Sequence, residues 1–314
     1  PPPPPPPPPP TGRWWSASSP WNTPFNGSET IDAARTSYIQ GLGNYEIVWR
    51  SYGVAFYQAP AGTPRYTVKR TAGGNLYLRN VPIPANVYPA AGSDAHLSIL
   101  DSDPNSPTYN CVFDFLHPGT VGGSGTTFDY SDPRGQYVQR ERISEESGFV
   151  RGASTRGSSN ANLGGILTSQ ELAAGRIDHA IGLYVPAAQA DNGQVHGPSY
   201  TSDGTSQTSL LPESARVRVD PAWNPSGLPV WQQTLVRALQ TYGGYIIDQG
   251  GRDIPAIDNT HSGYGPAYPW GNTEYPQLDV SITQHMQVLS LGPTRTETYD
   301  PVMSHPCGNF TSSP

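Results

Sequence analysis

The sequence has 314 residues, a formal net charge of −7 and only 14% charged residues. An acidic chain without a cluster of Lys and Arg has nothing to neutralise a phosphate backbone, which excludes nucleic acid as a partner. No apolar run approaches the length of a membrane span. The 34 Gly and 35 Pro, beside 18 Tyr and 7 Trp, are typical of short aromatic strands divided by tight turns. We therefore expect an all-β protein, a β-sandwich or jelly-roll with a few short helices.

The chain starts inside a run of proline, Pro1–Pro10, which predicts a polyproline II rod. We assign residues 1–13 to a linker that tethers the protein to another module or surface, and 14–314 to a single β-sandwich domain with an irregular C-terminal tail. Such a start suggests a processed piece of a longer secreted protein. Thr11–Phe25 holds three Trp and a Phe, which either clamp a sheet edge or form platforms for sugar rings.

The first half of the domain predicts one helix followed by strands. Apolar residues at helical spacing and a terminal glycine indicate a helix over Ser28–Gly43. We expect the strands Glu46–Arg50, Val54–Gln58, Arg65–Arg70 and Asn75–Val81.

The segment Gly92–Phe115 predicts a hairpin that carries polar side chains. The period of two puts Asp94, His96 and Ser98 on one face of its first strand, with Ala95, Leu97 and Ile99 on the other. The second strand alternates likewise, and Asp114 lies on its polar face. Asp94, His96 and Asp114 are therefore expected on one concave surface.

The second half alternates loops with short elements. Gly119–Gly165 is rich in Gly and Ser, and its charge run Arg140–Glu146 predicts a solvated loop or short strand. Gln189–Ser209 is expected to be a polar loop. In chain order the predicted elements are helix Thr168–Gly175, strand Ile177–Val185, strand Ala215–Val219, helix Leu228–Tyr242, strand Tyr245–Asp248 and strand Gln284–Leu291. An aromatic stretch, 261–275, precedes the last strand.

The two cysteines, Cys111 and Cys307, are either one disulfide or two free buried thiols. We expect the disulfide, which would pin the tail beside the hairpin and favour a secreted, extracellular protein.

From Gly92 onward, the order of motifs resembles a widespread family of secreted, largely uncharacterised bacterial proteins common in actinobacteria. The family pattern is G-S-D-x-H, then a Cys followed by an acidic residue, E-L-x-x-G-x-I-x-H-A, P-x-x-A-R-x-R-L and A-L-Q-x-Y-G-x-Y-I-x-D. The matching segments are Gly92–Asp101, Cys111–Asp114, Gly164–Ile181, Pro212–Val219 and Ala238–Asp248. The resemblance implies export and a shared site, and carbohydrate only by association.

The candidate catalytic residues are the polar ones inside these motifs: Asp94, His96, Asp114, His179 and Asp248. His179 is alternatively a hydrogen-bonded core residue, and its neighbour Asp178 an exposed charge. No cofactor is expected, although a divalent metal at Asp94, His96 and His179 also fits the residue types.

Two carboxylates and a His suit several chemistries. A glycoside hydrolase needs two carboxyl groups about 5–10 Å apart. A polysaccharide lyase needs a base and cations such as Arg142, Arg151 or Arg176 to neutralise a uronate. No P-loop, zincin, CxxC or GxSxG motif is present. We expect a secreted enzyme that cleaves a polysaccharide, with hydrolase preferred over lyase. The rival is a non-enzymatic surface or filament protein, or a glycan-binding module.

Overall fold

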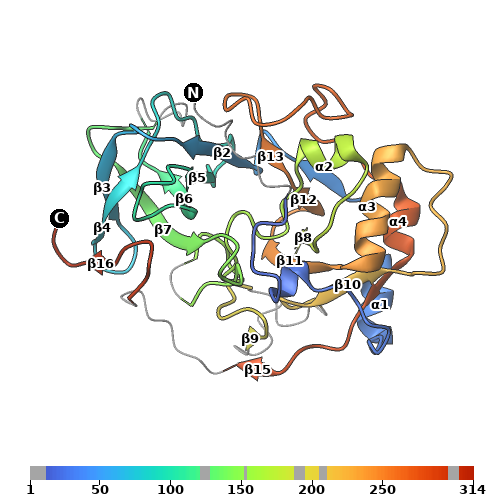
Figure 1. The fold of residues 1–314 in the computed structure, drawn as a ribbon. Coiled ribbons are helices and arrows are strands. Elements are labelled where there is room, and N and C mark those ends of the chain that lie inside the picture. Colours follow the sequence, from blue (N-terminus) through green and yellow to red (C-terminus); the bar gives the residue numbers. More distant parts are fainter. Residues whose placement is uncertain (1–11, 121–127, 152–153, 187–194, 205–210, 296–303) are drawn as a thin grey trace.

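The computed structural model describes residues 12–120, 128–151, 154–186, 195–204, 211–295 and 304–314, and Figure 1 shows its ribbon. A large sheet lies on the left of this view, and the helices gather on the right around a smaller sheet. The polyproline segment Pro1–Pro10 lies outside the described residues.

The large sheet has eight strands and supplies the predicted hairpin. In sheet order its strands are β13 (Ile257–Asp258), β2 (Val54–Ala59), β5 (Leu97–Asp101), β6 (Cys111–Pro118), β7 (Arg134–Arg142), β3 (Arg65–Arg70), β4 (Leu76–Pro82) and β16 (Phe310–Thr311). β5 and β6 are antiparallel with Ser98 opposite Asp114, which confirms the predicted pairing. β5 begins at Leu97, however, so Asp94 and His96 precede the strand.

The small sheet has four strands, β14 (Met286–Val288), β10 (Arg216–Val219), β11 (Gly244–Gln249) and β8 (Ile181–Val185), in that order. The helices are α1 (Ala33–Gln40), α2 (Ser169–Ala174), α3 (Val230–Thr241) and α4 (Val280–Gln284), with a 3₁₀ turn at Pro20–Asn22. Two further pairs join β1 (Glu46–Val48) to β12 (Asp253–Pro255) and β9 (Val195–His196) to β15 (Thr294–Arg295). Among the described residues, no helix has the length and apolar character that crossing a membrane requires.

The protein is rich in strands with few short helices, as predicted. Its sandwich or jelly-roll form stays a prediction, and some strand pairs, β2–β5 and β8–β11 among them, are parallel. Two local predictions differ from the structure. The charge run from Arg140 begins inside β7, where Arg140 and Glu141 are buried. The predicted strand Gln284–Leu291 divides between the end of α4 and β14, because Asp279 caps a short helix that the strand pattern hides.

α2 is the helix that the sequence predicts best. Thr168 accepts a hydrogen bond from the Glu171 backbone, and the Glu171 side chain reaches back to the backbone of Thr168, which completes a capping box. Gly175 ends the helix in the left-handed region, at φ 68°.

The aromatic N-terminus is part of the core. Trp14, Trp15 and Trp21 are buried, and Trp21 stacks on Phe149 with ring centroids 5.1 Å apart. Of the two interpretations of Thr11–Phe25, the structure supports the clamp.

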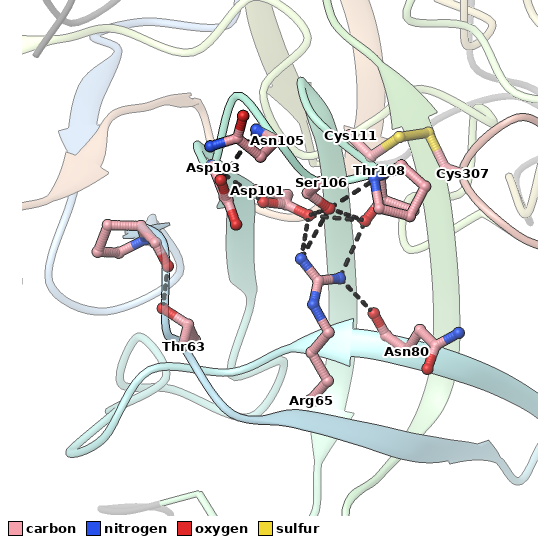
Figure 2. A network of polar contacts seen from close by, with 12 residues as sticks. Thr63, Arg65, Asn80, Asp101, Asp103, Asn105, Ser106, Thr108, Cys111 and Cys307 are labelled. Carbon is pink, nitrogen blue, oxygen red and sulfur yellow. Dashed lines mark hydrogen bonds and ion pairs between the residues drawn. A yellow bond between two sulfur atoms is a disulfide. The ribbon is translucent and has the colours of Figure 1, made fainter.

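The disulfide Cys111–Cys307 is present, as predicted, and attaches the C-terminal tail to β6. Figure 2 shows a polar network beside it, in which the fully buried carboxylate of Asp101 accepts from Arg65 at 2.7 Å, Ser106 at 2.7 Å and Thr108 at 2.6 Å. This network compensates for the burial of one carboxylate inside the large sheet.

Candidate functional site

A cavity of about 610 Å³ is lined by segments of both sheets and by loops. Its lining includes three of the predicted site residues, Asp94, His96 and Asp248. Its other walls come from β3, β6, β7 and the loops around residues 154–157 and 201–203. The remaining lining residues are Arg70, Gly73, Leu116, His117, Tyr137, Ser154, Thr155, Arg156, Gly157, Thr201, Ser202, Asp203 and Gln249. Polar side chains dominate this lining, so the cavity suits a polar ligand.

Asp94 and His96 lie in a bend just before β5. The Ala95 backbone between them is in the left-handed region, at φ 48°, which ends the strand alternation predicted there. The backbone N–H of His117 donates to the Asp94 carbonyl at 3.0 Å and ties the bend to the end of β6. The Nε2 atom of His96 lies 3.9 Å from Oδ2 of Asp94. The two side chains therefore still meet, although through a bend and not through a strand face.

The two members of this pair differ in exposure. The Asp94 side chain is 41% exposed, whereas that of His96 is 1% exposed. Neither ring nitrogen of His96 has a hydrogen bond of good geometry to a described residue. Burial lowers the pKa of His96 well below its usual value, and the charges of Arg156 and His117 act in the same direction against a weaker contact with the Phe115 backbone. His96 is therefore an uncharged imidazole at neutral pH.

Arg156 joins this pair to Asp248. Its Nη1 atom contacts the hydroxyl of Tyr184 and lies 3.7 Å from Oδ2 of Asp248. Asp248 stands at the end of β11, just after a register shift between Ile246 and Asp248 relative to β8. Burial raises the pKa of Asp248 to about 7, against the opposing charge of Arg156.

Two further carboxylates, Asp203 and Glu213, lie beside Asp248. One ligand oxygen of each of the three lies within 4.8 Å of the others. Glu213 is buried, and burial followed by the charge of Asp203 raises its pKa well above the usual value. Asp203 is exposed at the cavity wall.

The structure keeps Asp114 out of the cavity lining. It is fully buried and accepts hydrogen bonds from Ser98 at 2.5 Å, Gln139 at 2.8 Å and the backbone N–H of Asn162 at 2.9 Å. Burial raises its pKa to about 6 despite these donors. Asp114 ties β6 to β5, β7 and the loop at Asn162, which is a structural role.

His179 is also placed elsewhere, in the loop before β8. Its Nδ1 atom lies 2.7 Å from the carbonyl of Ala180, and its Nε2 atom lies 2.9 Å from Oε1 of Glu171. Burial opposes protonation of His179, but the carboxylate of Glu171 outweighs it and raises the pKa. His179 is thus a paired core residue, and the metal set of Asp94, His96 and His179 is not a cluster of close ligand atoms. Asp178 pairs with Arg176 at 2.7 Å.

The arginines of the cavity differ from the candidates in the sequence. Arg142, Arg151 and Arg176 do not line it, whereas Arg70 and Arg156 do. Sequence reasoning also missed Asp203 and Glu213. Glu213 falls within the motif segment Pro212–Val219, but at a position that the motif leaves open, so no signal in the sequence singles it out.

Comparisons with protein families, with curated proteins and with solved structures found no match for this chain. The resemblance to the secreted bacterial family therefore stays a prediction, and the site has to be interpreted from its own chemistry.

Proposed function

We propose that this chain is a secreted enzyme that cleaves an extracellular polysaccharide, with the cavity over Asp94, His96 and Asp248 as its active site. The observation that carries the proposal is that these three residues, from segments about 150 residues apart, line one open, polar cavity. The disulfide supports export, because such bonds persist in oxidising compartments.

Hydrolysis is our first candidate reaction. It needs one group that gives a proton to the leaving oxygen and a second, usually a carboxylate, that acts on water or on the anomeric carbon. Asp94 is a partly exposed carboxylate beside His96 and takes the second role. His96, 3.9 Å away, positions Asp94, and the proton comes from the part of the wall that carries Asp203 and Asp248.

Elimination is the second candidate, and a specific observation favours it. A lyase takes a proton with an uncharged base while a cation neutralises the uronate carboxylate. His96 is uncharged at neutral pH, and the Arg156 guanidinium is near enough to lower its pKa. Under this reaction His96 is the base and Arg156 the neutralising cation.

The non-enzymatic alternative finds less support. A glycan-binding module needs exposed aromatic rings, but the N-terminal Trp residues are buried. In the aromatic stretch 261–275, Tyr264 and Tyr268 are buried and Tyr275 is exposed, but none of them lines the cavity. The stretch therefore supports neither a glycan-binding module at this cavity nor the sugar cleft expected of the enzyme.

The test is a glycan panel read for both new reducing ends and the absorbance of unsaturated uronates, with wild-type protein, Asp94→Asn and His96→Gln. We expect activity on one polymer class and a loss of about 10²-fold or more in both variants. His96 makes no hydrogen bond of good geometry, so His96→Gln should melt close to wild type.

Asp132→Asn is the matched control, because it removes an exposed carboxylate that does not line the cavity. It should keep full activity. A wild-type protein that binds glycans without cleaving any would refute the enzyme in favour of the binding module. A His96→Gln variant that melts far lower but keeps its activity would make His96 part of the scaffold.

A further inference from the structure

The strongest feature that the proposed reaction leaves unexplained is a group of three carboxylates at one point of the cavity. Asp203 comes from the loop after β9, Glu213 from the segment before β10, and Asp248 from the end of β11. Their ligand oxygens lie within 4.8 Å of one another. Three chain segments thus converge on one small volume with the same chemical group.

The surrounding chain holds these carboxylates together at short range. The backbone N–H of Asp203 donates to Oε2 of Glu213 at 3.1 Å, and Gln249 donates to the Asp203 carbonyl at 3.1 Å. Gly157 leaves them room, since a Cβ there would lie 2.2 Å from Oδ1 of Asp203 and 2.7 Å from Oε1 of Glu213. The arrangement therefore depends on a glycine, on a hydrogen bond to the Glu213 carboxylate and on a second hydrogen bond that holds the Asp203 backbone.

When ionised, the carboxylates at this point outnumber the cations beside them. Three carboxyl groups face one guanidinium, that of Arg156, at 3.7 Å from Asp248. Carboxylates that share a partly buried volume repel one another unless a proton or a cation lies between them, and the raised pKa values of Glu213 and Asp248 result from burial and from this repulsion.

An orphaned buried atom points to what is missing. Glu213 is only 2% exposed, and its Oε1 atom has no hydrogen bond of good geometry, although the Ser202 side chain lies near enough to the carboxyl group to act against the rise of its pKa. Buried carboxylate oxygens in folded proteins are almost always paired or coordinate a metal. In the same cavity, both ring nitrogens of buried His96 also lack hydrogen-bond partners of good geometry.

We propose that Asp203, Glu213 and Asp248 bind a divalent cation of the hard, oxygen-preferring class, with Ca²⁺ as the best fit. Ca²⁺ takes oxygen ligands at about 2.3–2.6 Å in flexible geometry, so ligands on opposite sides of the ion are about 5 Å apart. That matches oxygens within 4.8 Å of one another. Mg²⁺ binds at about 2.1 Å and requires near-ideal octahedral geometry, which side chains from three separate segments satisfy less easily than the flexible geometry of Ca²⁺. The open side toward the cavity leaves positions for water or substrate oxygens.

A second cluster, of two Glu and one His, serves as a control because its histidine nitrogen already faces a carboxylate. Glu141, Glu146 and His305 also bring ligand atoms within 4.8 Å. The Nδ1 atom of His305 accepts from the backbone N–H of Cys307 at 3.1 Å, so the proton of the neutral ring is on Nε2. That nitrogen points at Glu146, 2.9 Å away, and is a donor and not a metal ligand.

The proposal that a cation binds here does not depend on the proposed function. A role of that cation in the reaction does rest on the proposed function. A cation at this wall would polarise a bound water or a substrate oxygen and so supply the proton or the charge stabilisation that either proposed reaction needs. Asp94 and His96 remain the groups that act on the substrate.

The test uses the full chain after treatment with EDTA and dialysis. Isothermal titration with CaCl₂ should show one saturable site per chain, and the melting temperature should rise with Ca²⁺. Asp203→Asn and Glu213→Gln should weaken binding at least tenfold, while Glu146→Gln should bind like wild type. Without Ca²⁺ the two site variants should melt at or above wild type, because they remove repulsion. A variant that binds Ca²⁺ weakly but melts no lower than wild type in its absence is folded.

Three results would overturn the cation site. In the first, wild type binds none of Ca²⁺, Mg²⁺ and Mn²⁺. In the second, both site variants bind Ca²⁺ as tightly as wild type. In the third, Glu146→Gln weakens Ca²⁺ binding as much as the site variants do. A protein that binds Ca²⁺ but cleaves no glycan refutes only the proposed function. Glycan cleavage by a protein that binds no cation refutes only the cation site.

Discussion

The burial of Asp114 predicts a specific dependence of stability on pH. This carboxyl group is fully buried, and its pKa is raised from 3.8 to about 6. The folded state therefore binds its proton more tightly than the unfolded state does. The contribution of Asp114 to stability is fully present below pH 3.8 and is lost as the pH rises through about 6. We use Asp114→Asn, which cannot ionise and keeps an oxygen to accept hydrogen bonds, to isolate this contribution.

The magnitude follows from the two pKa values. One pKa unit corresponds to about 1.4 kcal/mol, so a rise from 3.8 to about 6 corresponds to about 3 kcal/mol. The free energy of unfolding of wild type, minus that of Asp114→Asn, should therefore fall by about 3 kcal/mol between about pH 3 and pH 8. The constant offset between the two proteins, from altered hydrogen bonds, does not change with pH.

Asp101 provides a control of opposite sign in the same sheet. Burial disfavours its ionised form, but hydrogen bonds from Thr108, Ser106 and Arg65 outweigh that effect and lower its pKa (Figure 2). Its contribution is present above pH 3.8 and is lost as the pH falls. The difference between wild type and Asp101→Asn should rise with pH where that for Asp114→Asn falls.

The assay is urea unfolding of the three proteins at a series of pH values, followed by tryptophan fluorescence. A difference for Asp114→Asn that stays flat or rises with pH would refute the reasoning, because the hydrogen bonds from Ser98, Gln139 and Asn162 would then stabilise the carboxylate more than burial destabilises it.

Two further predictions concern buried links. Glu171→Gln keeps the α2 cap but removes the charge partner of His179, so the free energy of unfolding should fall by roughly 3–5 kcal/mol. Because the pKa of His179 is raised, this loss should be largest below pH 6.5 and shrink at higher pH, and urea unfolding at pH 5.5 and 8.5 checks it. Replacing both Cys111 and Cys307 by Ala opens a loop with a sequence separation of 196 and should cost about 5 kcal/mol. Wild type treated with a reductant should lose the same amount, and an unchanged midpoint in either experiment would contradict the estimate.

Features with a local cause could be predicted from the sequence. The α2 helix follows from Thr168, Glu171 and Gly175, which act within about two turns of each other. The pairing of β5 with β6 follows from two apolar strands joined by a short turn-rich segment. The disulfide follows from a chain that contains only two cysteines, Cys111 and Cys307, together with the expectation that the protein is exported.

The site was predicted in part, and the errors have a common cause. The alternation rule extended the strand of β5 back over Asp94 and His96, whereas a left-handed residue, Ala95, ends it. The same rule puts Asp114 on the polar face of its strand, where the site was expected, yet the loop at Asn162 covers that face. The local pattern does not reveal this covering loop. Periodicity describes one element, and burial depends on what packs against it.

The remaining site residues are beyond any local pattern. Arg156, Asp203 and Glu213 lie in segments that look like polar loops, and only the tertiary fold brings them to Asp248. No spacing rule links these positions, because they lie in separate segments of irregular conformation.

The buried polar groups of the large sheet and of the cavity differ in how fully they are hydrogen-bonded. In the large sheet, Asp101 and Asp114 each have three or more hydrogen bonds. At the cavity, His96 and Oε1 of Glu213 are buried without a hydrogen-bond partner of good geometry, as are Nε and Nη2 of Arg156. A chain that satisfies its buried carboxylates so fully in one place has no structural reason to leave them unsatisfied in another, because each unpaired group costs about 1–3 kcal/mol. Buried atoms without such a partner also occur elsewhere in the described residues, among them the indole nitrogens of Trp14, Trp15 and Trp21, so the unpaired atoms at the cavity support a bound ion only together with the convergence of Asp203, Glu213 and Asp248.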